Sequence, residues 1–243
     1  MTDSCFIAKL GHYIDLSQDD REKLAGFEKE ERPLAAGQQA LDAGESIEHI
    51  HVVKEGWVVS YTLFPDGRRQ NIRAYLPGDI MGLSGIAYDH ATIHVEAVTE
   101  ATLCPFPKER VATLIRESPR LTALFFTLAM RDKVALRDTI RMLGRMQAED
   151  RLAHFLLDVQ ARLRIGSDDP VTRFRMPMSQ TMIADVLGIS FVSVNRAFRD
   201  LEQGGDIARH GREVEIVAEA AMAERCDFHD RYDRIDTAWF PEG

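Results

Sequence analysis

One uninterrupted helical pattern near the middle of the chain limits what the rest can fold into. Between Arg120 and Leu143 there is neither proline nor glycine, and Gly144 follows directly. A helix over this range would be roughly 35 Å long at 1.5 Å per residue, which is long for a domain of this size. With 243 residues and 45% apolar content, the chain can bury one large core or two ordinary ones, and we expect two domains.

One side of this helix carries an apolar stripe at alternating spacings of three and four residues, with Lys133 at one position. The stripe comprises Phe126, Ala129, Leu136, Ile140 and Leu143. Such spacing is typical of an imperfect coiled-coil seam, and it predicts a dimerisation helix. The alternative is a helix that packs only on its own domain.

The sequence ahead of this helix is typical of short strands separated by turns. From Arg32 to Pro107, β-branched and aromatic residues alternate with polar ones, and the Pro65–Arg68 segment is a turn. This pattern predicts an antiparallel β-roll or barrel. A short helix is expected from Ser17 to Glu28, with Ser17 as its N-cap.

Beyond a predicted hinge at Gly144–Ala148, the pattern becomes mostly helical. An amphipathic helix is expected from Glu149, ended by the GSDDP segment, and the RFR and MPM segments that follow are strand-like. Two helices flanking Gly188 come next, and then a hairpin with its tight turn at His210–Gly211. Glycine suits the turn at position 188 because it adopts left-handed conformations at low cost.

The helix after Gly188 divides into two faces. Phe191, Val194, Phe198 and Leu201 share the side that we expect to be buried, as do Ile183, Ala184 and Leu187 of the preceding helix. Val192, Asn195, Arg196 and Arg199 form a second stripe, which holds two cations and no acid. Helix, glycine turn and helix are typical of a helix-turn-helix, whose second helix enters the DNA major groove.

The chemistry of the second stripe suits base recognition. Arginine can pair with guanine, asparagine with adenine, and an apolar side chain can contact a thymine methyl. The predicted interface comprises Ser179, Gln180, Val192, Ser193, Asn195, Arg196 and Arg199, with Arg209, His210 and Arg212 of the hairpin contacting phosphates. The net charge is −9, and residues 149–217 hold nine Lys/Arg against eleven Asp/Glu, so binding must come from a local site. An ordinary helical hairpin with a solvated outer face is the alternative.

Several motifs span the chain: VVKEGWVVSY, the PDGR turn and YLPGDIMGLSG in the predicted roll, and IADVLGISFVSVNRAFRDLE with RHGREVEI after it. On these motifs, the chain resembles the Crp/Fnr family of transcription regulators from about Phe27 to Val217. The resemblance implies an α+β fold: an N-terminal helix and cyclic-nucleotide-binding-like roll over residues 1–118, a dimerisation helix and hinge over 119–147, and a winged helix-turn-helix over 148–217. Residues 218–243 form an extension, expected to be helical through Asp230. The implied partners are double-stranded DNA, a second copy, and RNA polymerase if the protein is an activator.

The signal-binding motifs of the family are altered in this chain. Leu83 follows Gly82 where cAMP-binding members have a glutamate, and Ala91-Thr92 replaces their Arg-Ser/Thr pair. We therefore expect an effector other than cAMP, with Met81, Leu83, Ser84, Ala91 and Thr92 lining its pocket. Val192 also stands where relatives of the oxygen sensor have a glutamate in the recognition helix. The base that this glutamate reads is therefore left open.

No cofactor is predicted for the chain. Its three cysteines are not clustered, which disfavours the iron–sulfur cluster of the oxygen-sensing members. Haem is a family-internal alternative, with His90, His94, Cys104 and Met81 as candidate ligands. A cupin-type metalloenzyme using His49, His51 and Glu55 is the rival from another class. No catalytic motif is recognised, and the lack of a signal peptide or an apolar span predicts a cytoplasmic protein with no membrane partner.

Overall fold

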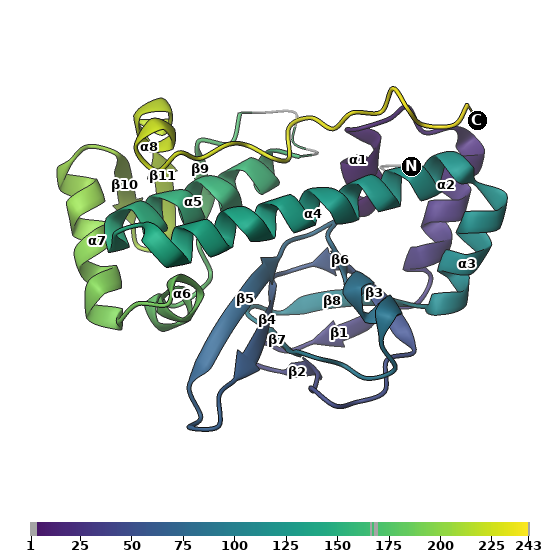
Figure 1. Ribbon diagram of the computed structural model, residues 1–243, viewed down its shortest axis with the longest axis horizontal. Coiled ribbons are helices and arrows are strands. Elements are labelled where there is room, and N and C mark those ends of the chain that lie inside the picture. Colours follow the sequence, from purple (N-terminus) through teal and green to yellow (C-terminus); the bar gives the residue numbers. More distant parts are fainter. Residues whose placement is uncertain (1–3, 166, 168–169, 243) are drawn as a thin grey trace. The chain divides into compact units, whose positions relative to one another are not determined.

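The computed structural model describes residues 4–165, 167 and 170–242, which form two compact units (Figure 1). The first unit contains the chain up to Met130 and again from Arg234 onward, and the second contains Arg131–Asp233. The long helix α4 (Pro119–Arg145) contributes residues to both units. Its observed bounds confirm the helix predicted from Arg120 to Leu143.

The first unit is built on a roll of two four-stranded antiparallel sheets, with strand orders β1-β8-β3-β6 and β2-β7-β4-β5. This confirms the predicted roll. The strands are β1 (Arg32–Leu34), β2 (Gln39–Leu41), β3 (His49–Glu55), β4 (Val58–Leu63), β5 (Arg69–Tyr75), β6 (Ile80–Met81), β7 (His94–Ala97) and β8 (Ala101–Pro107). The helices are α1 (Cys5–Gly11), α2 (Gln18–Ala25), the 3-10 turns η1 (Gly26–Glu28) and η2 (Leu83–Ala87), and α3 (Lys108–Glu117). Ser17 caps α2 as predicted, because its hydroxyl accepts from the Asp20 amide.

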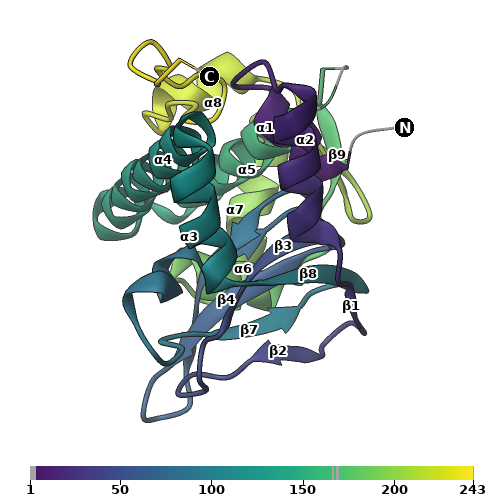
Figure 2. The same ribbon diagram turned by 90° about the vertical axis from the view of Figure 1, so that its right-hand side faces the viewer.

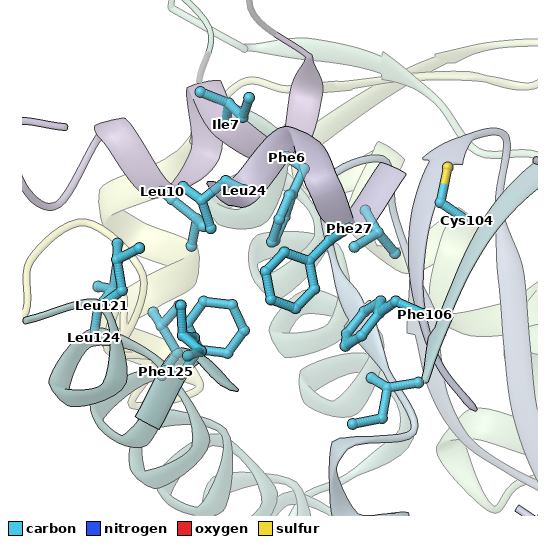
Figure 3. Close-up of a cluster of buried hydrophobic side chains, with 14 of the residues drawn as sticks. Phe6, Ile7, Leu10, Leu24, Phe27, Cys104, Phe106, Leu121, Leu124 and Phe125 are labelled. Atoms are coloured by element: carbon cyan, nitrogen blue, oxygen red, sulfur yellow. The ribbon is translucent and has the colours of Figure 1, made fainter. Parts of the chain in front are cut away.

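Two apolar cores lie on opposite faces of the β1-β8-β3-β6 sheet. The first, here called the roll interior, lies between the two sheets and includes Val53 and Leu103. The second, the helix-facing core, joins Ile50 and Val52 of β3 to side chains of α1, α2, α3 and α4, which cover this face (Figure 2). Phe27 is central in the helix-facing core, where its ring meets other aromatic rings edge-on (Figure 3). Neighbouring residues of β3 such as Val52 and Val53 enter different cores because successive side chains of a strand point to opposite faces of the sheet.

The second unit contains α5 and a winged helix-turn-helix. Its elements are α5 (Ala148–Arg164), β9 (Arg173–Arg175), α6 (Gln180–Leu187), α7 (Phe191–Gln203), β10 (Ile207–His210), β11 (Glu213–Ile216) and α8 (Glu219–Arg225). The three strands form one sheet in the order β10-β11-β9. The predicted hinge corresponds to a break at residues 146 and 147 between α4 and α5.

Three local predictions differ from the structure or lie outside it. The MPM segment at residues 176–178 is not a strand, although RFR is β9. The expected helix through Asp230 is wrong, because α8 ends at Arg225 and Asp227 adopts a left-handed φ of 47°. Residues 166, 168 and 169 of the predicted GSDDP stop lie outside the described residues. Over the described ranges no single helix is long and apolar enough to cross a membrane.

The predicted stripe on α4 is open to solvent along most of its length. Phe126, Leu136 and Ile140 are exposed, with Ile140 at 64%, and Ala129 and Leu143 are half-buried. On the other side of α4, side chains such as Leu124 enter the helix-facing core. The helix therefore buries one apolar face and leaves most of a second one exposed, where the Phe126 ring meets the Trp239 ring edge-on at 6.5 Å. Monomeric proteins rarely expose contiguous apolar surface without a functional reason.

Candidate nucleic-acid interface

Helices α6 and α7 form the predicted helix-turn-helix. Gly188 ends α6 with a φ of 61°, and its amide donates to the Ala184 carbonyl. Ser190 then caps α7, because its hydroxyl accepts from the Ser193 amide at 3.1 Å. The two helices are bent by 97° at this break. Glycine serves the turn because a left-handed backbone there would strain a residue with a side chain.

The buried side of α7 matches the prediction at three of its four residues. Val194, Phe198 and Leu201 are buried, and Ala197 joins them. Phe191 was expected among them, but it is 50% exposed. Successive residues of a helix lie 100° apart around its axis. Because Ala197 is among the buried residues, the centre of the buried side is turned away from Phe191, which lies in the first turn. Phe191 is therefore presented outward beside Val192.

The outward stripe of α7 combines an apolar end with two arginines. Val192 is 66% exposed, and Arg196 and Arg199 are exposed as well. Within the described part of the chain, Arg196 makes no ion pair, so its guanidinium donors are available to an external acceptor. An arginine presented in this way can bind a guanine through two hydrogen bonds.

Two polar residues on α7, Ser193 and Asn195, are engaged by hydrogen bonds within this helix and with its N-cap. The Asn195 amide nitrogen donates to the Phe191 carbonyl at 3.1 Å, and the Ser193 hydroxyl lies 2.9 Å from that of Ser190. Both residues are half-buried. A bidentate contact of Asn195 with adenine would therefore require its amide to leave this intrahelical bond.

Hydrogen bonds hold both ends of α6: a serine caps its start, and an arginine joins its end to the hinge. Exposed Ser179 caps α6 by accepting from the Met182 amide, and Gln180 is half-buried in its first turn. Arg151 of α5 donates to the Met146 carbonyl in the hinge and to the Leu187 carbonyl at the end of α6, both at 2.9 Å. Sequence reasoning missed Arg151, because an arginine on an amphipathic helix carries no signal that it bridges two other elements.

The wing is the β10–β11 hairpin, and its turn lies one residue later than predicted. His210 pairs with Glu213, so Gly211 and Arg212 form the turn, with Gly211 at a φ of 66°. His210 and Arg212 are exposed at this tip. Arg175 of β9 is exposed in register beside Glu213, which adds a cation that sequence reasoning did not include.

Arg209 differs from the other predicted wing cations because it is held inside the domain. Its guanidinium lies 2.6 Å from a Glu202 carboxylate oxygen and 4.2 Å from the centroid of the Phe198 ring. The side chain is only 23% exposed. Arg209 therefore packs on α7, and Arg212 is better placed than Arg209 to reach a phosphate.

The residues predicted to line an effector pocket are divided between different surroundings. Met81 belongs to the roll interior, whereas Leu83 packs against the helix-facing core on the other side of the sheet. Ala91 is buried, with its amide donating to the Glu45 carbonyl, and Ser84 and Thr92 are exposed. The Ala91 methyl group offers no positive charge where the resemblance places the arginine of cAMP-binding members.

The histidine strand of the rival metalloenzyme hypothesis lies on β3. His49 and Glu55 are exposed, while burial, followed by the charge of Arg32, lowers the pKa of His51 to about 4. Among the residues that the structure describes, no three His, Cys, Asp or Glu side chains come together as a metal site. Nothing in this geometry supports the cupin alternative.

The candidate haem ligands do not converge on one site. Cys104 is buried in the helix-facing core and Met81 lies in the roll interior. The Nδ1 atom of His94 is 3.0 Å from an Asp42 carboxylate oxygen, and His90 is exposed. Burial also raises the pKa of the Cys104 thiol to about 11, which disfavours the thiolate needed for redox sensing.

Comparison with known proteins matches both halves of the chain to families. Residues 31–118 match the cyclic nucleotide-binding domain and residues 150–225 match the Crp-like helix-turn-helix domain. The nitrogen fixation regulation protein FixK of Bradyrhizobium diazoefficiens is 34% identical over 177 residues, which cover 72% of this chain and 73% of FixK. This identity and coverage decide the family.

The chain belongs to the Crp/Fnr family of transcription regulators.

Other members resemble it over more of their length. The transcriptional activator protein Anr of Pseudomonas protegens is 27% identical over 88% of this chain and 87% of Anr. The structure of FixK2 from Bradyrhizobium japonicum covers 80% of this chain and 96% of FixK2, with a TM-score of 0.72 and 24% identity. A mutant of CooA from Carboxydothermus hydrogenoformans has a TM-score of 0.67 and 20% identity, covering 93% of this chain and 97% of CooA. These structures support the Crp/Fnr fold, and the predicted α+β class is confirmed.

Proposed function

We propose that this Crp/Fnr regulator is a homodimer that binds a palindromic DNA operator through α7. The observation that carries the proposal is the outward stripe of α7, where Val192 and Arg196 are exposed on a helix fixed from behind by Val194 and Leu201. A rigid recognition helix with an available arginine is suited to reading guanine in the major groove. The exposed tip of the wing adds Arg212 for phosphate contact.

The dimer in this proposal is supported by α4. Its largely exposed stripe, from Phe126 to Leu143, has the spacing of a coiled-coil seam, and a second copy would bury it. Two-fold symmetry then presents two copies of α7 to major-groove segments about one helical turn apart. The operator should accordingly be a palindrome with half-sites centred about 10 bp apart.

The experiment that tests this function is selection of bound fragments from a pool of random DNA duplexes. The expected result is enrichment of a palindrome that contains a guanine in each half-site. Enrichment of a single, non-repeated element would contradict the dimer, and no enrichment would contradict sequence-specific binding.

We further propose that the roll does not use cAMP as its signal. A cyclic phosphodiester carries a negative charge, and Ala91 and Thr92 supply no cation to pair with it. Calorimetry should detect no binding of cAMP at micromolar concentrations, and micromolar binding would refute this part. We also propose that the protein binds no haem, and a Soret band after reconstitution with haem would refute this. If the protein activates transcription, as the name of Anr states for that relative, RNA polymerase is a further partner.

A further inference from the structure

The extension after the wing turns back sharply at the end of α8. The amide of Phe228 donates to the Ala223 carbonyl at 2.8 Å, and the amide of Asp227 donates to the Glu224 carbonyl at 3.3 Å. These two bonds, with Asp227 in the left-handed region, form a Schellman-type helix end with aspartate in place of the usual glycine. The next residues run beside α4 and α5 (Figure 1). We call residues 227–233 the C-terminal strap.

The strap is attached to the second half of α4 by two ion pairs. The Arg141 guanidinium donates to the Asp227 carboxylate and, at 2.7 Å, to the Asp227 carbonyl. Arg231 donates from Nε to an Asp138 carboxylate oxygen at 2.8 Å. Asp138 is only 8% exposed, so this carboxylate would lose a charge partner in a largely desolvated position if the strap were absent.

The same short segment is attached to α5. The Tyr232 hydroxyl donates to an Asp158 carboxylate oxygen at 2.8 Å, and the Phe228 ring meets the His154 ring edge-on at 5.2 Å. The Tyr232 ring also lies 4.9 Å from the guanidinium carbon of Arg131 on α4 and 5.9 Å from that of Arg162 on α5. Tyr232 is 4% exposed, so one buried ring contacts both helices.

These attachments lie on either side of the hinge. Residues 146 and 147 break the helical path between α4 and α5, and such breaks are where helices change their relative angle. We infer that the C-terminal strap is a positioning element for DNA binding, which holds the second half of α4 and the winged helix-turn-helix at a fixed angle across the hinge. This inference rests on the proposed dimer on a palindromic operator.

A fixed angle has a specific consequence for a dimer on DNA. Each recognition helix is held at a set distance from its partner, so only half-sites with one spacing can be bound together. With a flexible hinge, the dimer could also bind half-sites at other spacings. Ordering the hinge on the correct spacing would then cost binding free energy. The strap contacts α4 and α5 and leaves the outward stripe of α7, with Val192 and Arg196, exposed.

The test compares two truncated chains with the full chain. A chain ending at Cys226 lacks the strap, whereas a chain ending at Asp233 keeps it and serves as the matched control. Tyr232→Ala and Arg231→Ala are milder variants in case the shorter chain fails to fold, and Tyr232→Phe removes only the hydroxyl. The first readout is amide hydrogen exchange over residues 142–151. The second is the affinity ratio between the selected palindrome and the same palindrome with two extra base pairs between its half-sites.

Loss of the strap should raise the rate of amide hydrogen exchange over residues 142–151 by roughly tenfold. It should also reduce the affinity ratio between the two palindromes by roughly tenfold. The chain ending at Asp233 should behave like the full chain in both measurements. Unchanged hinge exchange or an unchanged spacing ratio in a folded Cys226 truncation or Tyr232→Ala variant would overturn the inference. Tighter binding to the palindrome without the strap would also overturn it, because the strap would then oppose DNA binding. If the full chain selects no palindrome, the proposed function fails, and the exchange measurement still shows whether the strap holds the hinge.

Discussion

At the scale of single residues, two exposed arginines of the interface, one on α7 and one on the wing, should have different roles. Arg196 lies on α7 and Arg212 at the tip of the wing. Arg196→Ala should reduce the ratio of specific to random DNA affinity by about 5- to 150-fold, the equivalent of about 1–3 kcal/mol for a lost guanine contact. Arg212→Ala should weaken binding to all sequences equally and lower the salt dependence by about one charge. Fluorescence anisotropy titrations at several salt concentrations would measure both, and the reverse pattern would rule out this assignment.

Arg209 should act through stability rather than through DNA contact. Its ion pair with Glu202 and its position over the Phe198 ring join the wing to α7. Arg209→Ala should cost about 1 kcal/mol and lower Tm by a few degrees, after allowance for partial solvent screening. Arg212→Ala is the control and should leave Tm unchanged. Weaker DNA binding by Arg209→Ala without any change in thermal unfolding would show that Arg209 is a phosphate contact.

His51 gives the roll a dependence on acidic pH. Burial lowers its pKa from 6.5 to about 4 in the folded chain, so the unfolded chain binds the proton more readily between these values. The part of the unfolding free energy that depends on His51 is therefore fully present above pH 6.5 and is lost as the pH falls toward 4. The His51→Gln substitution removes this group, so its effect on the free energy of unfolding should be more favourable at pH 4.5 than at pH 7 by about 2 kcal/mol. Urea unfolding would measure this, with exposed His49→Gln as control; equal pH dependence in both variants would contradict the account.

At the scale of elements, α4 carries the prediction of self-association. Leu136→Glu or Ile140→Glu places a charge on the uncovered stripe, where a second copy would have to bury it without a partner. Either variant should sediment as a monomer at concentrations where the unaltered chain is a dimer. Arg145→Glu, exposed on the same helix outside the stripe, should leave the mass unchanged. Dimers that persist in both stripe variants would place the interface elsewhere.

The elements that sequence could predict are those whose pattern follows from local periodicity. The long helix, the α6–Gly188–α7 unit and the alternating strands of the roll all carry their own repeat or turn residue. The end of α8 carries no such signal, because Asp227 adopts a left-handed conformation that glycine usually supplies and its side chain pairs with distant Arg141. Phe191 was misassigned because the buried arc of α7 includes Ala197, which moves the centre of that arc away from Phe191.

The candidate site was predictable in type and less so in detail. The exposed positions of Val192, Arg196 and Arg199 follow from the helical period of α7. The internal pairing of Arg209 and the bridging role of Arg151 depend on contacts between elements, which a single sequence does not display. The separation of Met81 from Leu83 has the same origin, since they face different cores of the roll.

At the scale of the whole molecule, we propose that the protein is a two-state regulator. We expect a signal in the roll to alter the packing of α4 and so reposition the DNA-binding domains. A dimer already fixed in its DNA-competent arrangement is the alternative, and control would then lie in expression or turnover. A strap that holds the hinge is compatible with both, because it makes each DNA-binding domain move together with the second half of α4.

Hydroxyl-radical footprinting of the full chain on its selected operator would show whether two copies of α7 bind one palindrome. A dimer that reads a palindrome with two copies of α7 should protect two symmetric windows on one side of the duplex, centred about 10 bp apart. Arg196→Ala should remove both windows together. A single protected window, or two windows without two-fold symmetry, would contradict the account.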